Sequence, residues 1–194
     1  MITSLSELPT NLPVPTDDGA ALHLRDCVLP DVALPATNGT TVNLRMLRGR
    51  WVIYVYPMTG QPGVPLPDSW DEIPGARGCT PQSCGFRDHY TELKLLHTGV
   101  LGLSSQMTEY QREAKARLHL PFQLLSDSTM QLQNALRLPT FSVAGMTLFK
   151  RLTIIVENGF VKKVFYPVFP PDRNADDVVA WLKDAPRVAT LPTY

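Results

Sequence analysis

The chain has 194 residues, with 18 lysines and arginines, 18 aspartates and glutamates, and three cysteines. This length favours one domain with a substantial core, which we predict over residues 1–194. The balanced charge, without a basic run, argues against nucleic acid or an anionic membrane as partner, and three cysteines are too few for a disulfide-stapled scaffold. No apolar run has the length of a membrane span, and we see no signal peptide, so we expect a cytoplasmic protein.

The first thirty residues show little periodicity, and residues 1–28 are predicted to form an N-terminal arm. Cys27 has apolar neighbours and no nearby base, which favours a buried structural thiol over a reactive one. Further along, apolar stretches at residues 32–34 and 41–44 flank Asn38-Gly39. An Asn-Gly pair between two such stretches predicts a β-hairpin.

Trp51–Tyr56 is a run of β-branched and aromatic residues, which predicts a central strand buried on both faces. Pro57 ends this strand. Residues 58–78 then form a long loop rich in Pro and Gly that carries Trp70. A loop of this length inside a compact domain is usually functional, so we expect a lid or a binding wall, with a surface elaboration as the alternative.

Two of the three cysteines, Cys79 and Cys84, follow this loop. Side chains recur after them at the spacing of one helix face: Phe86, Tyr90, Leu93 and either Leu96 or His97. Thr80 is the predicted cap of this helix, because Thr can cap and the Pro81 after it is tolerated in a first turn. Cys79 is therefore expected at a helix N-terminus, where free N–H groups and the helix dipole favour a thiolate.

The spacing of Cys79 and Cys84 constrains what the two thiols can do. In an ideal helix, Cα atoms five residues apart are separated by roughly 8–9 Å. A disulfide requires them to be closer than about 7 Å. The two cysteines therefore cannot be joined in an intact helix, but could be joined if its first turn unwound. Arg77 and Arg87 are expected to add positive charge nearby.

The rest of the chain alternates between buried strands and helices. The predicted strands are residues 100–104, 122–126, 149–156 and 160–165. The predicted helices are residues 105–117, with Met107, Tyr110, Ala114 and Leu118 as apolar face, 128–136 and 174–182. Ser128 and Asn174 are the expected N-caps of the last two. This order predicts an α/β fold with a mixed sheet, and the cysteine loop follows the carboxyl end of its first buried strand, where open α/β sheets place their chemistry.

Five short motifs between about Leu29 and Lys183 carry a family resemblance. They are Val55-Tyr56-Pro57, Gly78-Cys79-Thr80 with Cys84-Gly85-Phe86-Arg87-Asp88, Gly102-Leu103-Ser104-Ser105, Leu125-Ser126-Asp127, and Arg151-Leu152-Thr153 before Asn158-Gly159. With these five motifs in this order, the chain resembles a peroxiredoxin of the Q type, also called bacterioferritin comigratory protein. The resemblance implies a thioredoxin-like mixed sheet flanked by helices, extended by the N-terminal hairpin.

The resemblance also implies roles for individual residues. Cys79 would be the peroxidatic cysteine and Cys84 the resolving cysteine. Arg151 would hold the thiolate and polarise the peroxide oxygen, and Pro57 would shield the cysteine from water. Gln82 lies where the family often carries Glu or Gln.

The chain departs from the family at one position close to Cys79. The family usually has Thr or Ser three residues before the peroxidatic cysteine, and here that residue is Ala76. Thr59 and Thr80 are the candidates to supply the missing hydroxyl. If neither does, peroxide activation depends on Arg151 and on backbone N–H groups. The loop over residues 58–78 is also longer than in the family.

The implied activity is reduction of hydrogen peroxide or organic hydroperoxides. The thiolate would become a sulfenic acid, then a disulfide, and an external dithiol such as thioredoxin would reduce that disulfide. No cofactor or metal is expected; a metal site of both cysteines with His89 is the minor alternative. A monomer and a homodimer are both compatible with the sequence.

Two other functions remain open for the same cysteine pair. One is a thiol–disulfide oxidoreductase, although that chemistry generally uses a C-x-x-C pair. The other is a non-enzymatic redox sensor, in which the disulfide melts the helix and changes a partner surface. Peroxide turnover with a reductant would separate an enzyme from a sensor.

Overall fold

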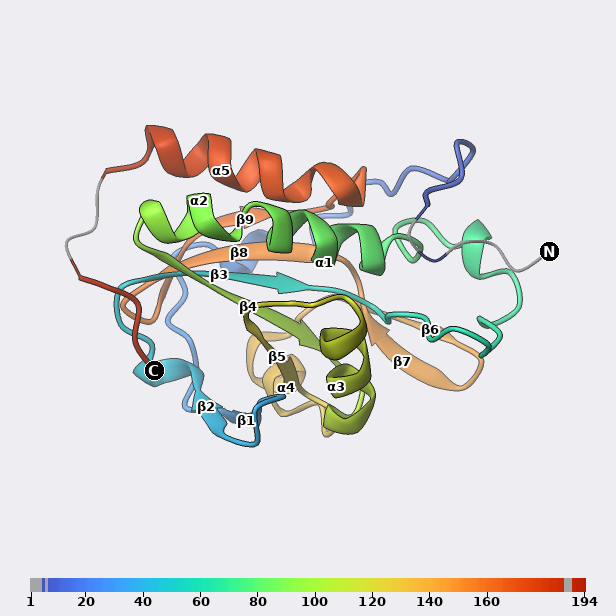
Figure 1. Ribbon diagram of the computed structural model, residues 1–194, viewed down its shortest axis with the longest axis horizontal. Helices are drawn as coiled ribbons and strands as arrows, with labels where there is room; N and C mark the ends of the chain where they lie inside the picture. Colours follow the sequence, from blue (N-terminus) through green and yellow to red (C-terminus); the bar gives the residue numbers. More distant parts are fainter. Residues whose placement is uncertain (1–4, 6, 187–189) are drawn as a thin grey trace.

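The computed structural model describes residues 5, 7–186 and 190–194, and a five-stranded mixed sheet lies at its centre (Figure 1). In sheet order the strands are β5 (Gln123–Ser126), β4 (Thr98–Ser104), β3 (Arg50–Val55), β8 (Leu152–Glu157) and β9 (Phe160–Phe165). The strands β3, β4 and β5 are parallel, whereas β8 runs antiparallel to both β3 and β9. The predicted central strand and mixed sheet are confirmed.

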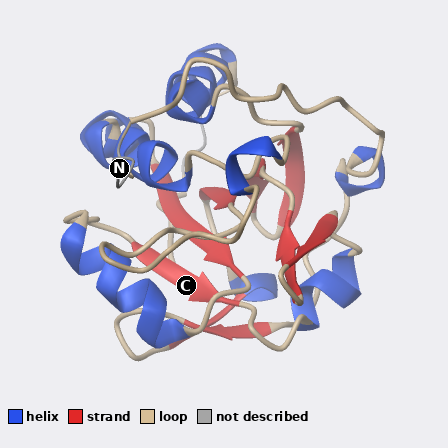
Figure 2. Cartoon of the chain, turned by 90° about the vertical axis from the view of Figure 1, so that its right-hand side faces the viewer, coloured by secondary structure: helices blue, strands red, loops and turns tan. Residues whose placement is uncertain are grey.

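Each face of the sheet is covered by its own hydrophobic cluster. On β3, Val52 and Tyr54 belong to one cluster, and Ile53 and Val55 to the other, as the two-residue period of a strand requires. The first face carries α1 (Cys79–Asp88), α2 (Tyr90–Leu95) and α5 (Asn174–Asp184). The second face carries the hairpin of β1 (Ala33–Pro35) and β2 (Thr41–Asn43), together with α4 (Gln131–Leu136). Figure 2 shows the strands in the interior with helices at the periphery.

The remaining elements lie at the sheet edges and in the loops. They are α3 (Thr108–Arg117), which packs along β5, the hairpin of β6 (Thr140–Val143) and β7 (Met146–Phe149), and the 3₁₀ helices η1 (Leu22–Leu24), η2 (Leu44–Met46), η3 (Trp70–Glu72) and η4 (Pro171–Arg173). No helix in the described part of the chain is long and apolar enough to span a membrane.

The strand predicted over residues 149–156 is wrong in its first part. β7 ends at Phe149 and β8 begins at Leu152, with Lys150 and Arg151 between them. The physical reason is the β6–β7 hairpin, which the sequence reading missed: the N–H of Lys150 donates to the carbonyl of Pro139, next to this hairpin. Arg151 therefore lies between two strands. The direction of its side chain is not fixed by the rule that successive side chains of a strand point to opposite faces of the sheet.

All three predicted helix caps are wrong. α1 begins one residue before Thr80, and Gly78 precedes it. The cap attributed to Ser128 is supplied instead by Asp127, whose carboxylate accepts hydrogen bonds from two backbone N–H groups of α4. Burial raises the pKa of Asp127. Asn174 is the first residue of α5, but its side chain bonds outside that helix.

Two further expectations are corrected at the helices. The cysteine helix is interrupted at His89, which separates α1 from α2, although Phe86 and Leu93 are buried as predicted. The helix predicted from residue 105 begins at Thr108, and Met107 is 66% exposed instead of packed. Polar bonds of the preceding loop explain the late start, because Gln106 uses its side chain to bind residue 59.

The N-terminal arm is described except for residues 1–4 and 6, which lie outside the described residues. Asp18 fastens the arm near the start of β8, because its carboxylate accepts hydrogen bonds from Lys150 at 2.6 Å and Tyr166 at 2.7 Å. These two bonds hold the pKa of Asp18 well below its usual range. Cys27 is half-buried instead of buried, and its thiol donates to the His23 carbonyl at 2.8 Å.

Candidate active site

Cys79 is the first residue of α1, and its side chain is 3% exposed. The helix begins here because Gly78 adopts a φ of 104°, which side-chain-bearing residues rarely reach. A Cβ at this position would also overlap Pro171 of η4. The start of α1 is thus pressed against η4, and the predicted placement of Cys79 at a helix N-terminus is confirmed.

The guanidinium of Arg151 lies against the sulfur of Cys79. Nη2 of Arg151 is 3.1 Å from Sγ of Cys79, and Arg151 is 3% exposed. Arg151 lies at the carboxyl end of β3, because Val55 at that end pairs with Leu152, the residue after Arg151. The contact with Arg151 places Cys79 at the same end. An arginine keeps its charge at all relevant pH values, so this contact stabilises a thiolate and a developing oxyanion.

Backbone carbonyls hold the guanidinium in place. Arg151 Nη2 donates to the carbonyls of Ala76 at 3.0 Å and Arg77 at 3.1 Å, and Nε donates to Gly75 at 3.3 Å. The thiol of Cys79 donates to the same Ala76 carbonyl at 3.6 Å. The segment just before the cysteine therefore wraps the cation that contacts the cysteine and binds its Nε and Nη2 atoms, but not Nη1.

Buried polar side chains lie behind the guanidinium and are joined to it by hydrogen bonds. Arg151 Nη1 donates to Oε1 of Gln82, and Nε2 of Gln82 donates to Oδ1 of Asn174 at 2.9 Å. The hydroxyl of Thr153 donates to the same Asn174 oxygen at 2.7 Å. All four side chains are at most 3% exposed. Gln82 and Arg151 were predicted from the sequence as site residues, whereas Thr153 and Asn174 were not. Thr153 belongs to the same motif as Arg151, Arg151-Leu152-Thr153, and could have been found there.

The other residues named from the sequence have partners of their own. Pro57 is buried, and its carbonyl accepts from the Ser104 hydroxyl at 2.9 Å. The hydroxyl of Thr59 donates to Gln106 at 3.1 Å, which does not direct it at the thiol. Thr80 is buried in the first turn of α1. Within the described part of the chain, the Cys79 sulfur contacts Arg151 and the backbone carbonyl of Ala76.

Cys84 lies on the same helix in different surroundings. It is half-buried, and burial raises the pKa of its thiol, an effect that the positive charges of Arg87 and Arg117 partly offset. The charge of Arg87 thus acts at Cys84. The three cysteines are free thiols in this structure.

The remaining charged residues named from the sequence pair with carboxylates. Arg77 lies 3.4 Å from Asp71, at the edge of the long loop. His89 contacts Glu92 at 3.1 Å and Asp176 at 3.0 Å. A metal site shared by His89 and the cysteines is therefore not assembled in this arrangement.

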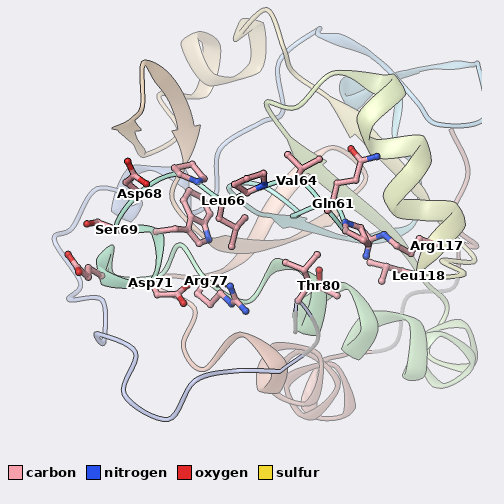
Figure 3. Close-up of a pocket in the computed structure, with 17 residues that line it drawn as sticks. Gln61, Val64, Leu66, Asp68, Ser69, Asp71, Arg77, Thr80, Arg117 and Leu118 are labelled. Carbon is pink, nitrogen blue, oxygen red and sulfur yellow. Dashed lines mark hydrogen bonds and ion pairs between the residues drawn. The ribbon is translucent and has the colours of Figure 1, made fainter. Parts of the chain in front are cut away.

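The long loop forms one wall of a cleft beside α1. The cleft has a volume of about 1000 Å³ and is lined by residues 61–72, by Thr80, and by Arg117 and Leu118 at the end of α3 (Figure 3). Its lining is mostly apolar, with Val64 and Leu66 on the loop side. Trp70 of the same loop is buried in a cluster with Ala76 and Leu148. The loop thus connects the cleft to the segment that wraps Arg151.

Comparisons with known proteins find relatives over most of the chain. The family model described as Redoxin matches residues 26–179. The chain is 26% identical over 183 residues to the chloroplastic peroxiredoxin Q of Gentiana triflora, covering 91% of this chain and 77% of that protein. It is 35% identical over 102 residues to peroxiredoxin bcp1 of Schizosaccharomyces pombe, covering 52% of this chain and 45% of that protein.

Solved structures share the fold. The peroxidoxin BcpB of Mycobacterium tuberculosis matches with a TM-score of 0.67 and 23% identity, covering 84% of this chain and 97% of that one. The bacterioferritin comigratory protein of Xanthomonas campestris, from a study of its alkyl peroxide reduction activity, matches with a TM-score of 0.64 and 23% identity, covering 90% and 97%. The thioredoxin-like architecture expected from the motifs is therefore confirmed.

Proposed function

The chain belongs to the redoxin family, as a peroxiredoxin of the Q type, and from this premise we propose that it is a thiol peroxidase in which Cys79 attacks the peroxide. The observation that supports this role best is the 3.1 Å contact between Arg151 Nη2 and Cys79 Sγ at the start of α1. This contact combines a fixed positive charge with the N–H groups of a helix N-terminus, where an anion is stabilised.

The first step is a displacement at oxygen. The Cys79 thiolate attacks one peroxide oxygen, the O–O bond breaks, and the other oxygen leaves as hydroxide or alkoxide and takes up a proton. Arg151 carries the positive charge that the leaving oxygen requires. Because Ala76 has no hydroxyl and Thr59 bonds to Gln106, the Thr80 hydroxyl and the backbone N–H groups of the first turn are the remaining donors.

The second step belongs to Cys84. Its thiol condenses with the Cys79 sulfenic acid, which releases water and forms a disulfide, and a thioredoxin-like dithiol then reduces that disulfide by exchange. Both cysteines lie on α1, so the first turn must unwind before the sulfurs can bond. The half-buried position of Cys84 leaves it accessible for this step.

The cleft supports organic hydroperoxides as substrates beside hydrogen peroxide. Its apolar wall starts at Thr80, the residue after Cys79, and has room for an alkyl group. Replacement of Val64, an exposed residue of the cleft wall, by Asp should lower kcat/KM for cumene hydroperoxide about tenfold and that for hydrogen peroxide much less, since only the former loses an apolar contact. Equal losses for both peroxides would remove the cleft from substrate binding.

One measurement tests the cycle as a whole: the intact mass after one equivalent of hydrogen peroxide, with peptide mapping. We expect a loss of two hydrogens, with Cys79 linked to Cys84, and no reaction in Cys79→Ser. Cys27→Ser is the matched control and should react as the wild type does. A gain of one oxygen on Cys79 without a disulfide would refute Cys84 as resolver, and no mass change would refute the peroxidase.

A further inference from the structure

The hydrogen bonds behind Arg151 have only one consistent direction. A guanidinium can only donate, so it requires the oxygen of the Gln82 carboxamide. The nitrogen of Gln82 then faces away from Arg151 and needs an acceptor, which is Oδ1 of Asn174. That oxygen also accepts from the hydroxyl of Thr153. The guanidinium of Arg151 thus fixes the orientation of the Gln82 and Asn174 carboxamides. Loss of the Asn174 oxygen therefore disturbs the hydrogen bond between Gln82 and Arg151.

Asn174 is an unusual residue for its position in the fold. Asn at the start of a helix commonly bonds to the backbone N–H groups of its own first turn. Here the side chain makes no such bond, is 1% exposed, and is directed at Gln82 and Thr153, which belong to α1 and β8. Packing of α5 is supplied by apolar residues on the same face: Ala175, Val178, Val179 and Leu182. The amide of Asn174 is therefore not needed for capping or for packing.

We propose that Asn174 is a positioning residue, which acts through Gln82 to hold the guanidinium of Arg151 on the sulfur of Cys79. The proposal rests on the proposed function, because it names a further residue that supports the same site. Without the Asn174 oxygen, the buried nitrogen of Gln82 loses its partner, and a buried unpaired donor is unfavourable. Gln82 then turns to find another acceptor and releases Nη1 of Arg151.

The test is the pH dependence of Cys79 alkylation by iodoacetamide, read from the mass of the peptide that contains Cys79. This readout does not require peroxide reduction. In Asn174→Leu, which keeps the side-chain size and removes the acceptor, we expect the alkylation profile to move about one unit to higher pH. At neutral pH the alkylation rate and the rate of sulfenic acid formation should both fall about tenfold.

Val178→Ala is the matched control for a general disturbance of α5. Val178 lies one turn after Asn174 and is fully buried, and it is part of the apolar packing. This variant should lower the melting temperature and leave the alkylation profile unchanged. A wild-type profile in Asn174→Leu, or an equal shift in Val178→Ala, would overturn the proposal.

A second pair of variants keeps the test decisive if Asn174→Leu does not fold. Thr153→Val removes only the hydroxyl that holds the Asn174 oxygen, in a strand where Val is well tolerated. We expect a smaller shift in the same direction, of about threefold in rate, and its reversal in Thr153→Ser. Identical profiles in these two variants would overturn the proposal. If alkylation follows Asn174 but no peroxide is consumed, the positioning role stands and the peroxidase assignment fails.

Discussion

The first and second turns of α1 carry the two cysteines of the proposed cycle in opposite surroundings. Cys79 is 3% exposed and lies against a guanidinium that is itself held by several hydrogen bonds. Cys84 is half-buried, and burial raises its pKa. The difference shows a division of labour within one helix. The thiol that we propose to meet peroxide lies against a fixed positive charge, whereas burial favours the neutral form of Cys84 while the helix is closed.

The two turns are also held by different forces. The first turn is held by polar contacts, from Gln82 to Arg151 and Asn174, and by the close approach of Gly78 to η4. The second turn is held by Phe86, which is fully buried and stacks on Tyr54 with ring centroids 4.6 Å apart. Oxidation of Cys79 changes the group that Arg151 faces, but leaves the aromatic stack untouched. Unwinding is therefore expected to stop before Phe86.

Among the variants that test the difference between the two cysteines, Cys84→Ser is expected to have the largest effect on peroxide turnover. This variant should form the sulfenic acid once and then stop, because no second thiol on α1 remains to close the cycle. Multiple turnover with a thioredoxin-like reductant, followed as peroxide consumed, should fall to the background. Continued turnover would show that another thiol, on this chain or a second copy, resolves the sulfenic acid.

Arg151→Met should separate the charge from the packing at the first turn. We expect sulfenic acid formation to slow by about 10²–10³-fold, the loss typical of one preorganised donor to a developing oxyanion. Quenched-flow mass analysis of Cys79 measures this rate. Arg112→Met is the control, since it removes an equally charged residue that is half-exposed on α3 and pairs with Glu109. A wild-type rate in Arg151→Met would exclude the guanidinium from the reaction.

Gly78→Ala should destabilise the first turn through its backbone. The added Cβ meets both an unfavourable φ and the ring of Pro171, so we expect a loss of about 2–4 kcal/mol in the free energy of unfolding. Gly63→Ala is the control, because its φ of 79° is similar but its Cβ has open space. Urea denaturation of both proteins measures the difference, and equal losses would show that the contact with η4 contributes nothing.

The smallest effect is the pH dependence of helix opening. In the closed helix the Cys84 pKa is raised by burial, and in the opened helix it returns towards its ordinary value. Between these values the closed form binds more protons, so its stability falls as pH rises past the ordinary thiol range of about 8.5. Amide hydrogen exchange of residues 79–83, corrected for the intrinsic rate, should show easier opening from pH 8 upward. Cys84→Ser should abolish this trend, and a trend unchanged in that variant would assign it elsewhere.

The sequence predicted what depends on local apolar pattern and missed what depends on distant polar partners. Phe86 and Leu93 were identified as buried because helical periodicity is visible in one segment. Asn174 was misread as a cap because its partner Gln82 is 92 residues away in the chain. Arg151 was identified by a motif, but its position outside β8 was not predicted. That position follows from the β6–β7 hairpin, whose turn at residues 144–145 is hard to recognise in the sequence. The neighbours of Cys79 in space could be named only in part, because they come from segments that lie far apart in the sequence.

Trp70 gives the molecule an intrinsic optical reporter. It is 4% exposed and packs with Ala76, whose carbonyl contacts both Arg151 and the thiol of Cys79. Indole emission depends on the polarity of its surroundings, and any rearrangement of the segment before Cys79 changes those surroundings. In a variant that keeps Trp70 and carries Phe at Trp51 and Trp181, we therefore expect the fluorescence to follow each oxidation and reduction of the active-site sulfur in real time, so that the cycle can be watched without a dye or a coupled assay.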